Sequence, residues 1–223
     1  MRSKIAPMVF VLVVLLSLTP AAQTQVKITA EHNSVATATK AFNFKTVPPP
    51  ATDDAAAKAK LLLVDGDLDP NGADLSALTD GVLPVDEDEP ARNLFFNAGT
   101  GGGRLSMDLG SAIEIARVST YSWHPNTRGP QVYKIWASDG MDPKFNSAPK
   151  GTIDPTTCGW KFIAVVDTRA KQGDDGGQHG VSLTDASGSL GKYRYLLFDF
   201  YVTETGDDFG NTFYSEVDVV AKK

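Results

Sequence analysis

The sequence has little cysteine, little histidine and few basic residues. It contains one cysteine, three histidines, and 21 Lys and Arg residues against 27 Asp and Glu residues. A single cysteine excludes a disulfide within the chain and a zinc site built on several thiolates. The net charge of −6 argues against a nucleic-acid partner, because binding to phosphates normally requires an excess of basic groups.

Familiar catalytic motifs are also missing. The chain has no Gly-x-Ser-x-Gly elbow, no His-Glu-x-x-His helix and no glycine-rich phosphate loop that opens a helix. The glycine-rich run 97–103 leads into a strand-like segment instead. A chance pair of carboxylates of the kind that glycoside hydrolases use stays open, but we expect a binding domain and not an enzyme.

Long apolar runs are confined to the N-terminus. Arg2 and Lys4 precede an apolar run at 5–18, and small residues follow at 19–22. This order is typical of a secretory signal peptide, and the run is too short to span a bilayer comfortably. We expect residues 1–22 to be a signal peptide and the mature protein to be secreted, periplasmic or at the cell surface, without a membrane span. The alternative is an uncleaved N-terminal anchor.

In an exported protein, Cys158 has no partner within the chain. A reactive thiol needs a nearby base and a lowered pKa, and the surrounding residues supply neither. We therefore expect a partly shielded, inert thiol, with intermolecular pairing as the alternative.

From residue 26 onward the chain alternates apolar and polar residues over short segments separated by Gly, Pro and Asp, with hardly any amphipathic helix. This pattern predicts an all-β protein, an antiparallel β-sandwich. No break in composition marks a second domain, so residues 23–223 are predicted to form one. The predicted strands are 26–30, 41–47, 61–64, 113–115, 117–123, 132–137, 162–166, 193–202 and 213–220, and the predicted loops are 97–103, 125–130, 139–159 and 173–180.

Five segments occur in an order that resembles a known family. They are Leu78-Thr79-Asp80-Gly81, then 103–110 (GRLSMDLG), 133–140 (YKIWASDG), 192–196 (KYRYL) and 215–219 (SEVDV). Together they resemble the discoidin-like domains, also called coagulation-factor type C domains, of the galactose-binding-like superfamily. The resemblance covers roughly residues 75 to 220. It makes 139–159 an inserted loop before Trp160, and 26–74 a set of extra N-terminal strands.

The resemblance implies a jelly-roll β-sandwich that binds ligands through loops at one end and is usually not an enzyme. Relatives such as the family 32 carbohydrate-binding modules bind sugars, whereas others bind phospholipid head groups or proteins. We therefore expect a secreted, non-catalytic carbohydrate-binding module whose partner is a glycan or cell-surface polysaccharide. The alternative is an extracellular or envelope protein–protein interaction or adhesion domain that uses the same loops or the inserted loop.

The resemblance also implies a structural calcium ion. Family members often hold calcium near the Asp-Gly turn with a carboxylate from the last strand, which points to Asp80 and Glu216. The family's usual residues after Gly81 are absent, and Asp86 or Asp88 could substitute for them. Calcium takes about six to eight oxygen ligands, so backbone carbonyls would complete the shell. In the alternative, Asp80 caps a turn and Glu216 faces solvent.

A second acidic segment, 67–72 (DLDPNG), is similar to the first half of an EF-hand loop. The twelfth position is Leu78 instead of glutamate, and no pair of flanking helices is evident. We therefore predict a turn stabilised by Asp, Asn and Gly.

The loop at 122–130 offers the clearest candidate for a ligand site. Trp123, His124, Asn126 and Arg128 bring a ring, an imidazole, an amide and a guanidinium together within six residues. A sugar needs a flat aromatic surface beside fixed donors and acceptors. Trp123 is the predicted platform and the other three side chains are the predicted hydrogen-bonding groups. In the alternative, Trp123 lies in the core and Arg128 pairs with a carboxylate that fixes the loop.

Overall fold

The computed structural model describes residues 25–170, 176–203 and 211–223. The predicted signal peptide, 1–22, lies outside these residues. Within them, no helix has the length and apolar character that crossing a membrane requires.

The described residues form antiparallel strands with a few short 3₁₀ helices, which confirms the predicted all-β antiparallel fold. The strands are β1 Val26–Ser34, β2 Lys60–Asp65, β3 Gly102–His124, β4 Val132–Ser138, β5 Lys161–Asp167, β6 Gly177–Asp185, β7 Gly191–Tyr201 and β8 Tyr214–Ala221. The 3₁₀ helices are η1 Ala56–Lys58, η2 Leu75–Leu78, η3 Pro90–Arg92 and η4 Pro155–Cys158.

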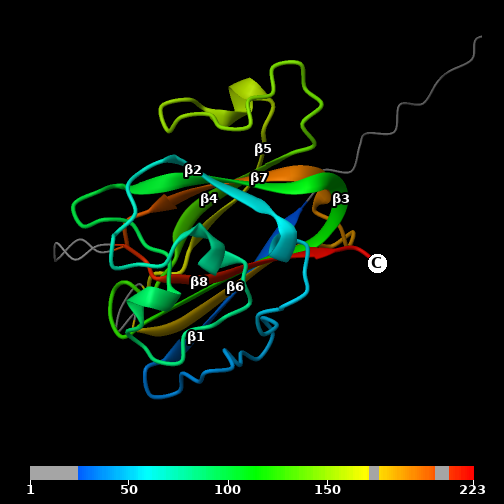
Figure 1. Ribbon diagram of the computed structural model, residues 1–223. Helices are drawn as coiled ribbons and strands as arrows, with labels where there is room; N and C mark the ends of the chain where they lie inside the picture. The colour runs from blue at the N-terminus through cyan, green and yellow to red at the C-terminus, as the bar shows by residue number, and fades with distance from the viewer. Residues whose placement is uncertain (1–24, 171–175, 204–210) are drawn as a thin grey trace, which may run out of the picture.

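Strand β3 connects the two layers of the sandwich (Figure 1). Its first half pairs with β2 and β7, and β4 and β5 extend that layer. Its second half lies between β6 and β8, and β1 completes the second layer. The register shifts between Asp108 and Ile113, around Gly110, whose φ is 82°. The segments 113–115 and 117–123, predicted as separate strands, are therefore parts of one strand that bends between layers.

The core between the layers is built from the inward side chains of both. Leu105 and Ile115 of β3, Phe198 of β7 and Val219 of β8 are all fully buried. Aromatic rings fill the centre, where the ring centroids of Phe200 and Tyr214 lie 4.3 Å apart. The alternation predicted from the sequence thus produces the core face of each strand.

The prediction of a strand at 41–47 is wrong, because this segment is irregular. Phe42 has a φ of 48°, which is incompatible with a strand. The backbone N–H groups of Thr46 and Val47 donate to the Glu31 carboxylate instead of to a neighbouring strand. The Phe42 ring packs edge-on against Trp123 at 5.5 Å, so the segment covers the outer face of the second layer.

The prediction of a loop at 173–180 is also wrong at its end, since β6 begins at Gly177. His179 pairs with His32 of β1 and Ser122 of β3, so β6 is a central strand of its layer. The first half of β6 consists of glycine and polar residues, so it lacks the alternation of apolar and polar residues that predicts a strand. A Cβ at Gly180 would lie 2.5 Å from the Phe44 ring, so a larger residue there would displace this ring.

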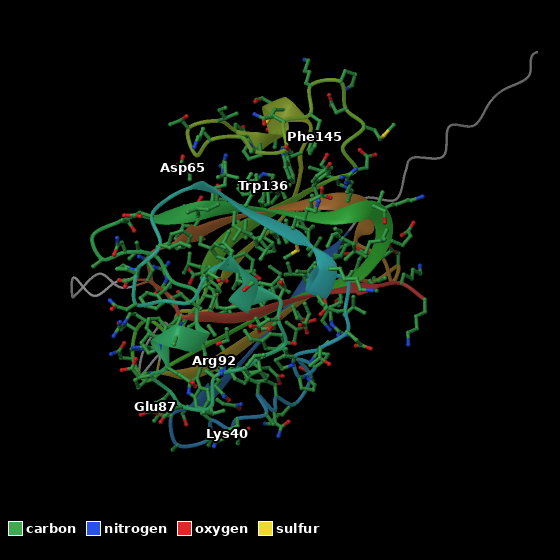
Figure 2. The ribbon with its side chains drawn as sticks, viewed as in Figure 1. Lys40, Asp65, Glu87, Arg92, Trp136 and Phe145 are labelled. Atoms are coloured by element: carbon green, nitrogen blue, oxygen red, sulfur yellow. The ribbon has the colours of Figure 1, made fainter. Side chains whose placement is uncertain are left out.

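The insertion at 139–159 folds back over the outer face of the first layer (Figure 1). Trp160 is 4% exposed and packs in a small cluster with Val64, Trp136 and Leu197. Figure 2 shows Phe145 of the insertion above Trp136 of β4, and Phe145 packs against the same cluster. The insertion therefore has a hydrophobic anchor of its own.

We predict that Phe42→Ala lowers the free energy of unfolding by about 3–5 kcal/mol, because it leaves a cavity beside Trp123. The measurement is urea denaturation followed by circular dichroism and by tryptophan fluorescence. Leu62→Ala is the control, since that side chain is 51% exposed. A Phe42→Ala variant as stable as the control would show that the N-terminal segment is not part of the same cooperative unit.

Candidate functional site

One end of the sandwich gathers several chain segments, and we call it the loop end. The start of β3 and the start of β4 both lie beside the end of β7, because Gly103 and Tyr133 each pair with Phe200. The loop 125–131, which joins β3 to β4, therefore lies at this end. The loop before β3 and the end of β2 lie there too, since Asp65 pairs with Arg104.

Trp123 lies at the loop end but is only 6% exposed. Its ring is packed against Phe42 and shares a cluster with Val47 and Tyr121. The prediction that Trp123 is an open platform for a sugar is therefore wrong, and the alternative, a core tryptophan, describes its position. The cause is the N-terminal segment, whose path over this face has no signal in the pattern of the strands.

His124 is also buried, at 1% exposed. Its ring lies edge-on against Phe213, with centroids 4.6 Å apart. Its Nδ1 accepts a hydrogen bond from the Asn126 backbone N–H at 3.2 Å. His124 therefore stabilises the turn after β3 from within the protein, and we do not include it among the proposed ligand-binding residues.

Asn126 and Arg128 are the two predicted ligand residues that reach the surface. Asn126 is exposed, and Arg128 is partly exposed with its guanidinium 5.1 Å from the centre of the Phe213 ring. The Phe213 backbone N–H donates to the Arg128 carbonyl at 3.0 Å, which ties the loop to the start of β8. These contacts hold both side chains at the rim of the loop end.

A pocket of about 500 Å³ opens at the same end. The end of β2, the loop before β3, the end of β7 and the insertion each contribute to its wall. The lining residues are Asp65, Gly66, Asp67, Thr100, Gly101, Gly102, Gly103, Arg104, Gly151, Asp199, Phe200 and Tyr201. We call it the Arg104 pocket.

Arg104 builds this pocket from within. The residue is 4% exposed. Its Nε and Nη2 both donate to the Asp199 carboxylate, with Nη2 at 2.7 Å. Its Nη1 donates to the carbonyls of Pro149, Lys150 and Ile153 at 2.8–3.1 Å. The bond to Asp199 raises the pKa of Arg104 above its ordinary value, so one fixed cation joins β3, β7 and the insertion.

Asp65 makes a second connection to the insertion. Its Oδ2 accepts from the Gly151 N–H at 2.8 Å, and its Oδ1 accepts from the Gly66 N–H at 3.1 Å. These bonds, with that from Gly151 the larger cause, hold the pKa of Asp65 below its usual value. Figure 2 shows Asp65 below the insertion, at the edge of the sheet. The carboxylate is therefore a fixed negative charge at the pocket mouth.

Sequence reasoning missed the Arg104 pocket. The signal that could have found it is Arg104 itself, a charged residue between a glycine run and an apolar strand. Such a residue needs a buried partner, but the sequence does not indicate that Asp199 and three carbonyls of the insertion supply it.

The Asp80 turn and Glu216 of β8 lie side by side, as the resemblance implies. The Gly81 N–H donates to Glu216 Oε2 at 3.1 Å. Glu216 is 1% exposed, so it does not face solvent. Burial first, and then the charge of Asp218, raise its pKa to about 9. Burial also raises the pKa of Asp218 to about 7, and Asp218 Oδ1 has no hydrogen-bond partner.

Asp86 does not join these carboxylates. It is exposed, and its Oδ1 accepts from the backbone N–H of Glu87. Asp80 Oδ1 accepts from the Val82 N–H at 2.7 Å, which makes Asp80 the cap of its own turn. Among residues 25–170, 176–203 and 211–223, no three His, Cys, Asp or Glu side chains are grouped to hold a metal. The predicted trio of Asp80, Asp86 and Glu216 is therefore not formed, because Asp86 faces solvent.

The segment 67–72 contains the predicted turn stabilised by Asp, Asn and Gly. Asp69 Oδ1 accepts from both the N–H and the side-chain amide of Asn71 at 2.9 Å. The Gly72 N–H closes the turn on the Asp69 carbonyl at 3.0 Å. Asp67 points elsewhere, and its Oδ2 accepts from the Asn97 amide at 2.9 Å.

Cys158 lies in the insertion and is partly buried. Burial is the main cause that raises the pKa of its thiol. The thiol therefore has less thiolate character than an ordinary cysteine, as the prediction of an unreactive group requires.

Comparison with known proteins finds likeness at the level of the fold. No protein-family model and no curated protein matches the chain. Similar solved structures include CBM32-1 from a family 31 glycoside hydrolase of Clostridium perfringens (12% identity, TM-score 0.46, 76% of this chain and 98% of that one). Another is the Streptococcus pneumoniae fucose binding module SpX-3 (12%, 0.45, 77% and 99%). A third is the lectin domain of Lectinolysin complexed with Lewis B antigen (15%, 0.46, 78% and 100%).

At such identities and TM-scores, the likeness does not indicate which ligand this chain binds.

We predict that stability of the metal-free protein falls as pH rises, because the folded state favours protonated Glu216. The pKa of this carboxyl is about 9 in the fold and about 4.5 in the unfolded chain. Its contribution to the free energy of unfolding is fully present below pH 4.5 and is lost as pH rises toward 9. Glu216→Gln should flatten this decline.

The measurement is urea denaturation between about pH 5 and pH 9 in the presence of a chelator. Asp53→Asn, which changes an exposed carboxylate, is the control and should keep the wild-type slope. Identical slopes for wild type and Glu216→Gln would contradict the raised pKa.

Proposed function

We propose that this protein is a non-catalytic carbohydrate-binding domain and that a sugar unit binds in the Arg104 pocket. The observation that carries the proposal is the pocket itself, about 500 Å³ at the loop end of a jelly-roll. Small-ligand sites have volumes of about 300–1,000 Å³. The solved structures similar in fold are named as a carbohydrate-binding module, a fucose binding module and a lectin domain, which agrees with the proposal without carrying it.

The lining groups suit a polyhydroxylated ring. The carboxylates of Asp65 and Asp67 are exposed acceptors for sugar hydroxyls, and Tyr201 contributes a partly exposed aromatic ring. The glycine run 101–103 lets a ligand approach the backbone closely. Each hydrogen bond contributes about 0.5–1.5 kcal/mol net, so an open site of this kind has a Kd in the range of about 1 μM to 1 mM.

Asn126 and Arg128 are proposed as the contacts for further units of an oligosaccharide. Both reach the surface at the loop end, and both are held by bonds to the core of the loop. An exported domain with such a site would bind a glycan or a cell-surface polysaccharide outside the cytoplasm. We propose that it is secreted, periplasmic or attached at the cell surface.

We also propose a structural calcium ion between the Asp80 turn and Glu216. Burial raises the pKa of both Glu216 and Asp218, and nearby carboxylates raise each further, Asp218 for the first and Asp54 for the second. With Asp218 Oδ1 unpartnered, this excess of acidic groups is one that a divalent cation would offset. Two carboxylates and the carbonyls of the turn are hard oxygen ligands, which calcium prefers. Because a trio of acidic side chains is not formed there, backbone oxygens would supply the larger share of the shell.

We predict that Gly101→Trp abolishes glycan binding without unfolding the protein. A Cβ at Gly101 would meet no atom within 4 Å, and its φ lies outside the left-handed region, so a new side chain causes no backbone strain at this lining residue, and an indole there is expected to obstruct the pocket. Binding is measured on a glycan array and then by isothermal titration calorimetry with the best ligand. Gly101→Ala, which adds one methyl group, is the matched control and should lose less than about threefold in affinity.

Two results would reject the pocket as the sugar site. One is an array on which wild type binds no glycan. The other is a Gly101→Trp variant that binds glycan as tightly as Gly101→Ala. If, in addition, only Asn126→Ala or Arg128→Ala lost glycan binding, the sugar site would lie on the rim instead.

We predict that calcium raises the melting temperature of wild type but not of Glu216→Gln. A ligand at 100 times its Kd stabilises the fold by about 2.7 kcal/mol, which corresponds to about 5–10 °C for a domain of this size. Differential scanning calorimetry with calcium, with magnesium and with a chelator gives the comparison. Melting that is the same in all three conditions would exclude the ion.

A further inference from the structure

The Arg104 pocket offers a ligand many acceptors and few donors. Among the residues that the structure describes, three carboxylates line it, those of Asp65, Asp67 and Asp199, against one cationic side chain. Thr100 Oγ1 donates to the Asn97 carbonyl at 2.7 Å, so its hydroxyl faces a ligand as an acceptor. A site of this composition is complementary to groups that carry hydrogen atoms on nitrogen or oxygen.

Arg104 does not correct this imbalance. Its Nε and Nη2 are both used on Asp199, and its Nη1 is used on three carbonyls of the insertion. The residue is 4% exposed. Its charge is therefore paired with that of Asp199, and its three nitrogens all take part in bonds that hold the pocket wall in place.

Two lysines near the pocket leave Asp67 without a cation. Lys150 Nζ donates to the Val64 carbonyl at 2.7 Å, and its charge acts on Asp65. Lys134 lies over the Tyr201 ring at 5.5 Å. Neither lysine lines the pocket. Asp67 is exposed, bonds to the neutral Asn97 amide, and takes part in none of the ion pairs found among the described residues.

We infer that the Arg104 pocket selects a sugar that carries a protonated amine, such as a 2-amino-2-deoxyhexose, and that Asp67 is the group that recognises the amine. The inference rests on the proposed function, because it names the class of sugar for that same pocket. A hydrogen bond between an ammonium group and a carboxylate is about twice as strong as one between neutral groups. An acidic sugar would place its carboxylate against those of Asp65 and Asp67, and it is disfavoured for the same reason.

The test compares sugars that differ at one group. Wild-type protein is titrated by calorimetry with glucosamine and N-acetylglucosamine, which share a ring but not a charge, and with glucose and glucuronate. The short oligomers of the first two sugars follow. We expect glucosamine to bind about tenfold more tightly than N-acetylglucosamine, glucose to resemble N-acetylglucosamine, and glucuronate to bind more weakly than glucose.

Variants locate the effect. Asp67→Asn keeps an oxygen acceptor but removes the charge, and it should reduce the preference for glucosamine to less than about threefold while glucose binding is retained. Asp69→Asn is the matched control, because it makes the same charge change in the same loop at a residue that does not line the pocket. It should keep the wild-type preference.

The outcomes separate this inference from the proposed function. Equal binding of glucosamine and N-acetylglucosamine would overturn the inference and leave sugar binding intact. Absence of binding to every sugar and to the array would overturn both. If lysine amide bound as tightly as glucosamine, the pocket would recognise an amine without a sugar, and the inference would be overturned. If Asp69→Asn reduced the preference for glucosamine as much as Asp67→Asn, the preference would arise from long-range charge alone, which would also overturn the inference.

Discussion

The pocket and the insertion both depend on the buried guanidinium of Arg104. A charge removed from water costs several kcal/mol unless partners replace its hydration, and here partners engage all three nitrogens of the group. Asp199 takes one edge of the guanidinium, and carbonyls from 149–153 take the other. Loss of Asp199 would leave an uncompensated buried charge, which typically costs about 3–5 kcal/mol. The insertion is held to the sheet by its carbonyl bonds to Arg104 at one point and by the Trp160 cluster at another.

The opposite situation exists at the other buried charges of the molecule. Glu216 and Asp218 lie on the same face of β8 and are 1% and 0% exposed. Glu216 accepts from the Gly81 N–H, and Asp218 accepts from the Ala51 N–H and the Tyr121 hydroxyl. These hydrogen bonds do not prevent a large rise in the pKa of either carboxyl. The charge of Arg104 is satisfied inside the chain, whereas burial favours the protonated forms of Glu216 and Asp218. Because of this contrast, the proposed calcium ion is assigned to β8 and not to the pocket.

Much of the fold was predictable because strands with one buried face alternate in sequence. Strands β4, β5, β7 and β8 lie within a few residues of their predicted bounds, and the Asp80 turn meets Glu216 as the resemblance implies. The errors come from residues whose environment is set by distant segments. Phe42 lies outside any strand because its ring packs on Trp123. Strand β6 carries polar residues although it lies between two other strands. Neither effect is present in local periodicity.

The candidate site could be predicted in position but not in composition. The loop end follows from topology, since the strands that form it are consecutive or paired. Which side chains can face a ligand depends on which segments cover the strands and loops at this end. The N-terminal segment buries Trp123, and the insertion adds a wall to the pocket through Gly151. Both features are additions to the sandwich, so the sequence segments that carry the resemblance do not predict them. The exposed carboxylates of Asp65 and Asp67 come from the end of β2 and from the turn that follows it. In the sequence their acidity indicates only a solvated turn, because nothing there shows that the same segment lines a pocket beside Arg104.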